Sequence, residues 1–196
     1  VSIGSEEDKY AFHFDKKKVD MILSKVPSAS KVAVVSVVGA FRTGKSFLLS
    51  WFLQYLNHLS NNNNKQKAPS SKQEKKEWYS SFDAIGKTGF DWKGGAERNT
   101  TGIWMWSEPF LLDDTNLAVL LIDTQGMFDH ETTMSLTASI FGFSTLLSSY
   151  QIYNVDKRIQ EDNLQHLALF SEYARMALGI EEEEKSGGAV ELNENG

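Results

Sequence analysis

The sequence predicts an α/β domain in which helices flank a mostly parallel β-sheet. Runs of β-branched and aliphatic residues alternate with amphipathic segments, an order typical of parallel strands joined by helices. A loop with two glycines, residues 39–46, stands directly between one such apolar run and one amphipathic segment. The 196 residues are 41% hydrophobic and 23% charged, which suffices for one domain with a real core.

The first third of the chain contains four predicted elements. Residues 10–14, Tyr-Ala-Phe-His-Phe, alternate in the manner of an edge strand. Asp15 is a candidate N-cap for a short helix, in which apolar residues recur at helical spacing until Pro27. The β-branched run 32–38 predicts a buried strand, and the loop after it leads into a helix that we expect to end near Leu59.

The remaining elements follow the same alternation. Apolar runs at residues 103–106, 117–122 and 150–153 predict strands, and residues 132–148 predict a helix between the last two. Residues 159–178 predict a strongly amphipathic helix, which Gly179 would end. We therefore expect one domain over residues 1–178.

Two segments lack the composition of a folded core. Residues 60–77 are polar and of low complexity, and residues 179–196 are acidic and rich in glycine. We expect a disordered insertion and a disordered acidic tail.

Composition excludes several classes of function. A formal charge of −6 leaves no basic footprint for nucleic acid, and the absence of cysteine excludes disulfides, zinc–thiolate sites and a cysteine nucleophile. No apolar run approaches the roughly 20 residues of a membrane helix. The chain begins without Met or a signal-peptide pattern, so we expect a fragment whose membrane role, if it has one, lies in sequence outside this chain.

The loop has the pattern G-x-x-x-x-G-K-S, which is typical of a phosphate-binding loop in a P-loop NTPase. Its backbone N–H groups and the following helix dipole favour an anion. Lys45 would reach the β- and γ-phosphates, and the Ser46 hydroxyl would bind Mg²⁺. The residues expected to contact the nucleotide here are Gly39, Arg42, Thr43, Gly44, Lys45, Ser46 and Phe47.

A second motif, Asp123-Thr124-Gln125-Gly126, follows the predicted strand 117–122. A carboxylate at that position can hold Mg²⁺, usually through water, and the N–H of Gly126 can meet the γ-phosphate. Between the two motifs, Thr100 and Thr101 are the candidates for a switch threonine that completes the Mg²⁺ shell.

One position predicts how the reaction is catalysed. Ras-type enzymes place a water-orienting Gln after the glycine of D-x-x-G, whereas this chain has Met127. Arg42, inside the loop, is the candidate for an arginine finger in cis, with a solvated loop cation as the alternative. His130 is a further candidate base, with an ordinary surface histidine as the alternative.

These motifs together resemble the GTPase domain of the atlastins, dynamin-like proteins of the endoplasmic reticulum. The resemblance covers residues 10–178 apart from the insertion, and residues 103–106 are also similar to the related guanylate-binding proteins. It is carried by Gly39-Ala40-Phe41-Arg42-Thr43-Gly44-Lys45-Ser46, Gly89-Phe90-Asp91-Trp92-Lys93-Gly94-Gly95, Glu97-Arg98-Asn99-Thr100-Thr101-Gly102-Ile103, Asp123-Thr124-Gln125-Gly126 and Gln160-Glu161-Asp162-Asn163-Leu164-Gln165-His166-Leu167.

The resemblance implies a dynamin-like G domain that binds GTP and GDP with Mg²⁺. It implies hydrolysis coupled to a nucleotide-dependent, head-to-head homodimer, and fusion of endoplasmic-reticulum membranes from their cytoplasmic face. It also implies that Arg42 is the catalytic arginine, that Lys45 and Ser46 bind phosphate and Mg²⁺, and that Thr100 is the switch threonine. By itself this chain is expected to be soluble.

The sequence departs from the atlastin pattern at two places. Lys93 stands where atlastins usually carry Arg, and Lys lacks the bidentate fork. The family's guanine-reading Arg-Asp pair is absent, so we expect an incomplete G domain with no identifiable base reader. A non-catalytic truncated isoform that acts as a binding module, and an ATP-using P-loop enzyme, are the alternatives.

Overall fold

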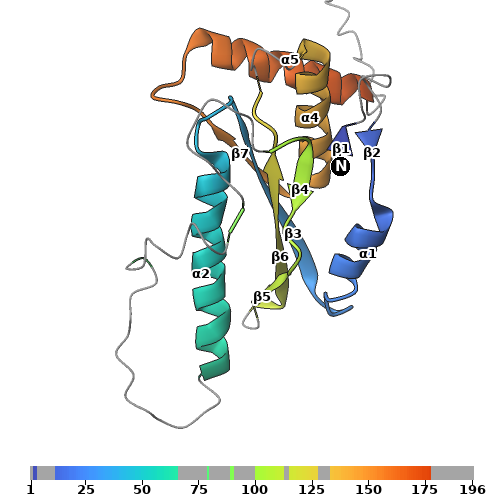
Figure 1. The fold of residues 1–196 in the computed structure, drawn as a ribbon, viewed down its shortest axis with the longest axis vertical. Helices are drawn as coiled ribbons and strands as arrows, with labels where there is room; N and C mark the ends of the chain where they lie inside the picture. Colours follow the sequence, from blue (N-terminus) through green and yellow to red (C-terminus); the bar gives the residue numbers. More distant parts are fainter. Residues whose placement is uncertain are drawn as a thin grey trace, which may run out of the picture.

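A computed structural model of the chain describes residues 2–3, 12–65, 79, 89–90, 100–112, 115–127 and 133–177. A five-stranded sheet with the order β4-β6-β3-β7, in which β5 also pairs with β6, forms its centre (Figure 1). A separate two-stranded sheet joins β1 to β2. The elements are β1 (Ser2–Ile3), β2 (Phe12–His13), α1 (Lys16–Leu23), β3 (Lys31–Gly39), α2 (Lys45–Lys65), β4 (Ile103–Met105), β5 (Phe110–Leu112), β6 (Leu117–Thr124), α4 (Met134–Leu147), β7 (Tyr150–Asn154) and α5 (Glu161–Ala177).

The predicted α/β P-loop fold, mostly parallel and flanked by helices, is confirmed. The central strand β3 pairs in parallel with β6 on one side and with β7 on the other. Strands β4 and β5 pair antiparallel to β6, so the sheet is mixed. Strand β5 was not predicted, because three apolar residues after Pro109 are too few to show a strand period.

The two faces of the sheet carry separate cores. Val37 of β3 packs with Leu49 and Leu53 of α2, whereas its neighbour Val38 packs with Phe141 of α4 and Phe170 of α5. Successive strand residues point to opposite faces, so one strand supplies both cores. Figure 1 accordingly shows α2 on one side of the sheet and α1 and α4 on the other. Both layers hold the carboxyl end of β3, where the loop begins.

Capping fixes the ends of the shorter helices. The side chain of Asp15 accepts a hydrogen bond of 3.1 Å from the backbone N–H of Lys18, which confirms the predicted N-cap of α1 and lowers the pKa of Asp15. The helix ends at Leu23, with Ser24 as its C-cap, ahead of the predicted stop at Pro27. Thr133 caps α4 in the same way, accepting from the N–H of Leu136 at 3.2 Å.

Helix α2 is longer than the sequence predicts. It continues to Lys65, so residues 60–65, which we assigned to a disordered insertion, are helical. The segment contains neither Gly nor Pro before Pro69, and a helix already formed adds each residue at little cost. The rest of that insertion, residues 66–77, lies outside the described residues, and so does the predicted tail 179–196. Within the part of the chain that the structure covers, no helix has the length and apolar character needed to cross a bilayer.

Candidate nucleotide phosphate site

The loop between β3 and α2 follows a path that its neighbours dictate. Gly39 ends β3 with φ 151°, and a Cβ there would lie 2.1 Å from the backbone oxygen of Asn154 on β7. Only glycine fits such an approach. At its other end the loop becomes helix, where the N–H of Leu48 donates to the oxygen of Gly44 at 2.9 Å. The N-terminus of a long helix therefore faces the space enclosed by the loop, which is a favourable position for an anion.

Lys45 lies back over the loop instead of extending into solvent. Its side chain is 6% exposed, and Nζ donates to the backbone oxygen of Ala40 at 2.8 Å. The Thr43 hydroxyl donates to the same oxygen at 3.0 Å. A lysine ammonium is thus held inside the loop, where a phosphate would meet it.

Three side-chain oxygens meet beside the loop. The Ser46 hydroxyl donates to Oδ2 of Asp123 at 2.6 Å, and the Thr100 hydroxyl donates to the same atom at 3.1 Å. The two hydroxyls lie 3.5 Å apart. The structure thereby brings together the three residues predicted to bind metal, and of the two candidate threonines it places the Thr100 hydroxyl against the Asp123 carboxylate.

These oxygens fit Mg²⁺. Hydroxyl and carboxylate oxygens are its preferred ligands, and it normally keeps several waters. In the described ranges, no group of three or more His, Cys, Asp or Glu side chains is arranged to hold a metal ion. Burial raises the pKa of Asp123, against the lowering effects of the Ser46 hydrogen bond and the Lys45 charge. A bound cation would offset the cost of burying this carboxylate.

Met127 forms an isolated parallel bridge with Ala40, three residues past the end of β6. The N–H of Phe41 donates to the oxygen of Met127 at 2.8 Å, and the N–H of Met127 donates to the oxygen of Gly39 at 3.1 Å. The Met127 side chain is fully buried among Val38, Phe141 and their neighbours. It therefore belongs to the hydrophobic core.

Gln125 makes hydrogen bonds that the D-x-x-G motif did not predict. Its buried Oε1 accepts from the N–H of Gly102 at 2.8 Å, and its own N–H donates to the Gly102 oxygen at the same distance. These bonds tie the segment that carries Thr100 to the end of β6. The only feature of the sequence that could have indicated this role is the position of Gln125 inside D-x-x-G.

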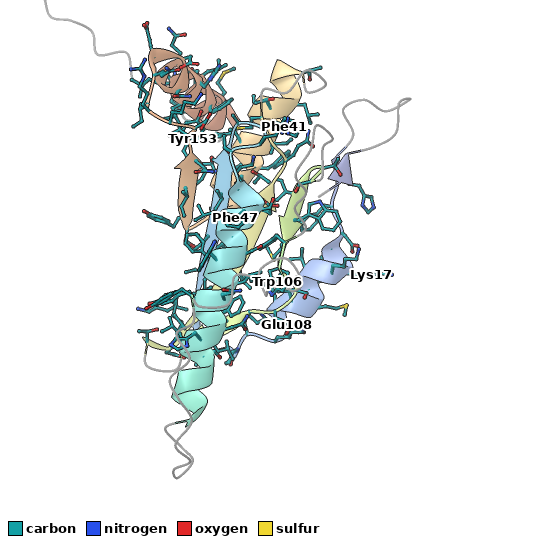
Figure 2. All side chains as sticks on the ribbon, turned by 60° about the vertical axis from the view of Figure 1, so that its left-hand side comes forward. Lys17, Phe41, Phe47, Trp106, Glu108 and Tyr153 are labelled. Atoms are coloured by element: carbon teal, nitrogen blue, oxygen red, sulfur yellow. The ribbon has the colours of Figure 1, made fainter. Side chains whose placement is uncertain are left out.

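Arg42 is exposed, with φ 64°, and its guanidinium carbon lies 5.9 Å from the centre of the Phe41 ring. Phe47 lies on the first turn of α2 (Figure 2), with its ring 6.4 Å from that of Trp51. The catalytic role of Arg42 stays a prediction, and so do the contacts of Gly39, Thr43, Gly44, Phe47 and Gly126 with nucleotide. His130, Lys93 and Arg98 lie outside the described residues.

The sheet order, the loop, the buried lysine and the oxygen cluster define a P-loop nucleotide-binding domain. Residues 9–193 match the family described as guanylate-binding protein, N-terminal domain. The chain belongs to this family of dynamin-like GTPases, which confirms the resemblance seen in the sequence.

Individual relatives agree with this assignment. The chain is 43% identical to rat (Rattus norvegicus) atlastin-1 over 182 residues, which are 91% of this chain and 30% of the relative. It is 43% identical to human atlastin-2 over 178 residues, 89% of this chain and 28% of the relative. It is 44% identical to Drosophila melanogaster atlastin over 187 residues, 91% of this chain and 32% of the relative. The chain thus spans about a third of the length of these relatives.

Proposed function

We propose that this domain binds GTP with Mg²⁺ and hydrolyses it to GDP and phosphate. The observation that carries the proposal is the meeting of Ser46, Thr100 and Asp123 beside a loop that holds a buried lysine. Oxygen ligands for a cation and an ammonium donor for phosphate then lie next to each other, as phosphoryl transfer requires. The choice of guanine rests on the name of the family, guanylate-binding protein.

Each residue has a stated task in this proposal. Lys45 and the N–H groups of the loop neutralise phosphate charge, and Ser46, Thr100 and Asp123 would hold Mg²⁺. The ion, when bound, neutralises charge that develops on the phosphate oxygens. Because Met127 is buried in the core, charge on the γ-phosphate must be met by another group, and we assign this task to Arg42.

In the longer protein we propose that hydrolysis is coupled to dimerisation and to homotypic fusion of endoplasmic-reticulum membranes. This part rests on the resemblance to the atlastins, and membrane attachment would come from segments outside this chain.

The test measures both binding and single-turnover hydrolysis of radiolabelled GTP and, in parallel, ATP, with Mg²⁺ or with EDTA. We expect phosphate release from GTP that requires Mg²⁺. Binding without release would favour the alternative, a non-catalytic phosphate-binding module. Equal release from ATP would overturn the guanine preference, and absence of binding would overturn the proposal as a whole.

A further inference from the structure

A residue of a neighbouring strand contacts the phosphate loop and was not part of any motif. Strand β7 lies parallel to β3, and the last residues of the two strands, Asn154 and Gly39, are paired in register. In Figure 2, Tyr153, which precedes Asn154, lies at the same end of the sheet as Phe41 of the loop. The carboxyl end of β7 therefore borders the loop on the side opposite β6.

Asn154 contacts the loop at two points. Its side-chain Nδ2 donates to the backbone oxygen of Thr43 at 2.7 Å, across 111 residues of sequence. Its own backbone oxygen occupies the space that a side chain at position 39 would need. One residue thus borders the start of the loop and holds a peptide near its end.

The held peptide is the one that joins Thr43 to Gly44. Gly44, which supplies its N–H, has φ 83°, and Arg42, the residue before Thr43, has φ 64°, so the peptide lies in a stretch of backbone with an unusual conformation. A peptide unit is planar, and in the trans form its C=O and N–H point in opposite directions. A hydrogen bond that fixes the Thr43 oxygen toward Asn154 of β7 therefore fixes the Gly44 N–H so that it points away from β7.

We infer that Asn154 is a positioning residue for phosphate binding, which acts by orienting the Gly44 N–H toward the nucleotide. The inference rests on the proposed function, because it requires that the loop bind phosphate. It concerns affinity for nucleotide and assigns Asn154 no contact with the reacting atoms. Without its side-chain amide, the Thr43–Gly44 peptide is free to rotate, and its N–H is lost as a preorganised donor.

The same strand supplies a matched control. Gln151 of β7 also carries an amide that makes part-buried hydrogen bonds, but its partners belong to α4. Its Nε2 donates to Oγ of Ser144, and its Oε1 accepts from the Thr145 hydroxyl, each at 3.1 Å. Gln151→Met removes these bonds at similar volume and leaves the loop untouched, so it reports the structural cost of losing an amide from β7.

The experiment is titration of a fluorescent GTP analogue into the protein and into Asn154→Leu, Asn154→Ala and Gln151→Met, with melting temperatures measured in parallel. For both Asn154 variants we expect Kd to rise by about tenfold, the effect of losing one well-placed donor in a buried setting. Gln151→Met should keep the Kd of the unaltered protein even where its melting temperature falls. The Ala variant, which is smaller, decides the question if the Leu variant does not fold.

Two outcomes overturn the inference. One is a Kd within about twofold for the folded Asn154 variants, below the effect of one hydrogen bond. The other is an equal rise in Kd for Gln151→Met, which would show that any weakening of β7 disturbs the loop. If Lys45→Ala also leaves binding unchanged, or if the unaltered protein does not bind, the proposed function itself fails, and the two failures are thus distinguished.

Discussion

The hydroxyl of Ser46 donates a hydrogen bond of 2.6 Å to Oδ2 of Asp123. Ser46 lies on the first turn of α2, and Asp123 lies next to the last residue of β6, the parallel neighbour of β3. The fold brings them together because the loop turns the chain from the end of β3 into α2 at the same edge of the sheet. The Thr100 hydroxyl donates to the same carboxylate oxygen from a third segment. One oxygen atom of Asp123 therefore connects helix α2, strand β6 and the segment that carries Thr100.

Ser46→Ala should raise the Mg²⁺ concentration that GTP binding requires. The substitution removes one of the oxygens available to the cation, so we expect an apparent affinity for Mg²⁺ at least about tenfold lower, in line with a lost charge-assisted contact. Titration of Mg²⁺ at fixed GTP measures it. Ser50→Ala is the control, because that buried hydroxyl donates to the Ser46 backbone oxygen at 2.9 Å and lies one turn from the site. Equal Mg²⁺ affinities for the two variants would remove Ser46 from the metal site.

Gly126→Ala should disturb the loop through direct contact. An added Cβ would lie 2.6 Å from the Cα of Phe41, so either the loop or the end of β6 must move. We expect a lower melting temperature and weaker nucleotide binding. Gly142→Ala on α4 is the control, since a Cβ there meets nothing within 4 Å and Ala is worth about 0.5–1 kcal/mol over Gly in a helix. Unchanged binding by Gly126→Ala would show that this contact does not constrain the loop.

Arg42→Ala should slow hydrolysis more than it weakens binding. Arginine fingers contribute roughly 10³–10⁵ in rate in other GTPases, and Lys at this position would lack the planar fork. Single-turnover hydrolysis at saturating GTP isolates the chemical step, with Arg42→Lys as the variant that keeps the charge. A rate for Arg42→Ala within about threefold of the unaltered protein, where a catalytic group should matter by over tenfold, would make Arg42 only a loop cation.

Much of the fold could be predicted because its signals are local. A continuous apolar run predicted β3 and β6, and helical spacing predicted α5 to within two residues at its start. The antiparallel direction of β4 and the existence of β5 could not be predicted, since strand direction and short strands depend on pairing partners. The predicted end of α2 was wrong because we took the polar, Asn-rich sequence after Leu59 to exclude a helix. The preceding turns were already helical, and extending a formed helix costs little.

In the candidate site, too, local sequence patterns could be predicted and contacts between distant segments could not. Residues within a motif, such as Lys45 and Asp123, were predicted because fixed spacing reflects a fixed task. The bonds from Gln125 to Gly102 and from Asn154 to Thr43 were not predicted, because they join distant segments through backbone atoms of no particular type. A polar residue at the carboxyl end of the strand beside the loop was the one available signal for Asn154.

The corrected boundary of α2 leads to a further prediction. Replacing residues 66–77 with a short Gly-Ser bridge should change the melting temperature little, since this polar stretch lacks the apolar residues that a core needs. Deleting 60–77 also removes the last six helical residues and should cost more. Thermal unfolding of the two deletions compares them, and a larger loss from the shorter deletion would contradict this assignment.

Titration with a fluorescent GTP analogue tests the proposal that residues 39–46 bind the phosphates of GTP. Lys45→Ala should weaken binding by about tenfold to a hundredfold or more, because a charge-assisted contact is lost. Lys31→Ala, at the exposed start of β3, the strand that leads into the loop, should leave the affinity unchanged. Unchanged affinity of folded Lys45→Ala for the analogue would contradict the assignment of this loop as the phosphate site.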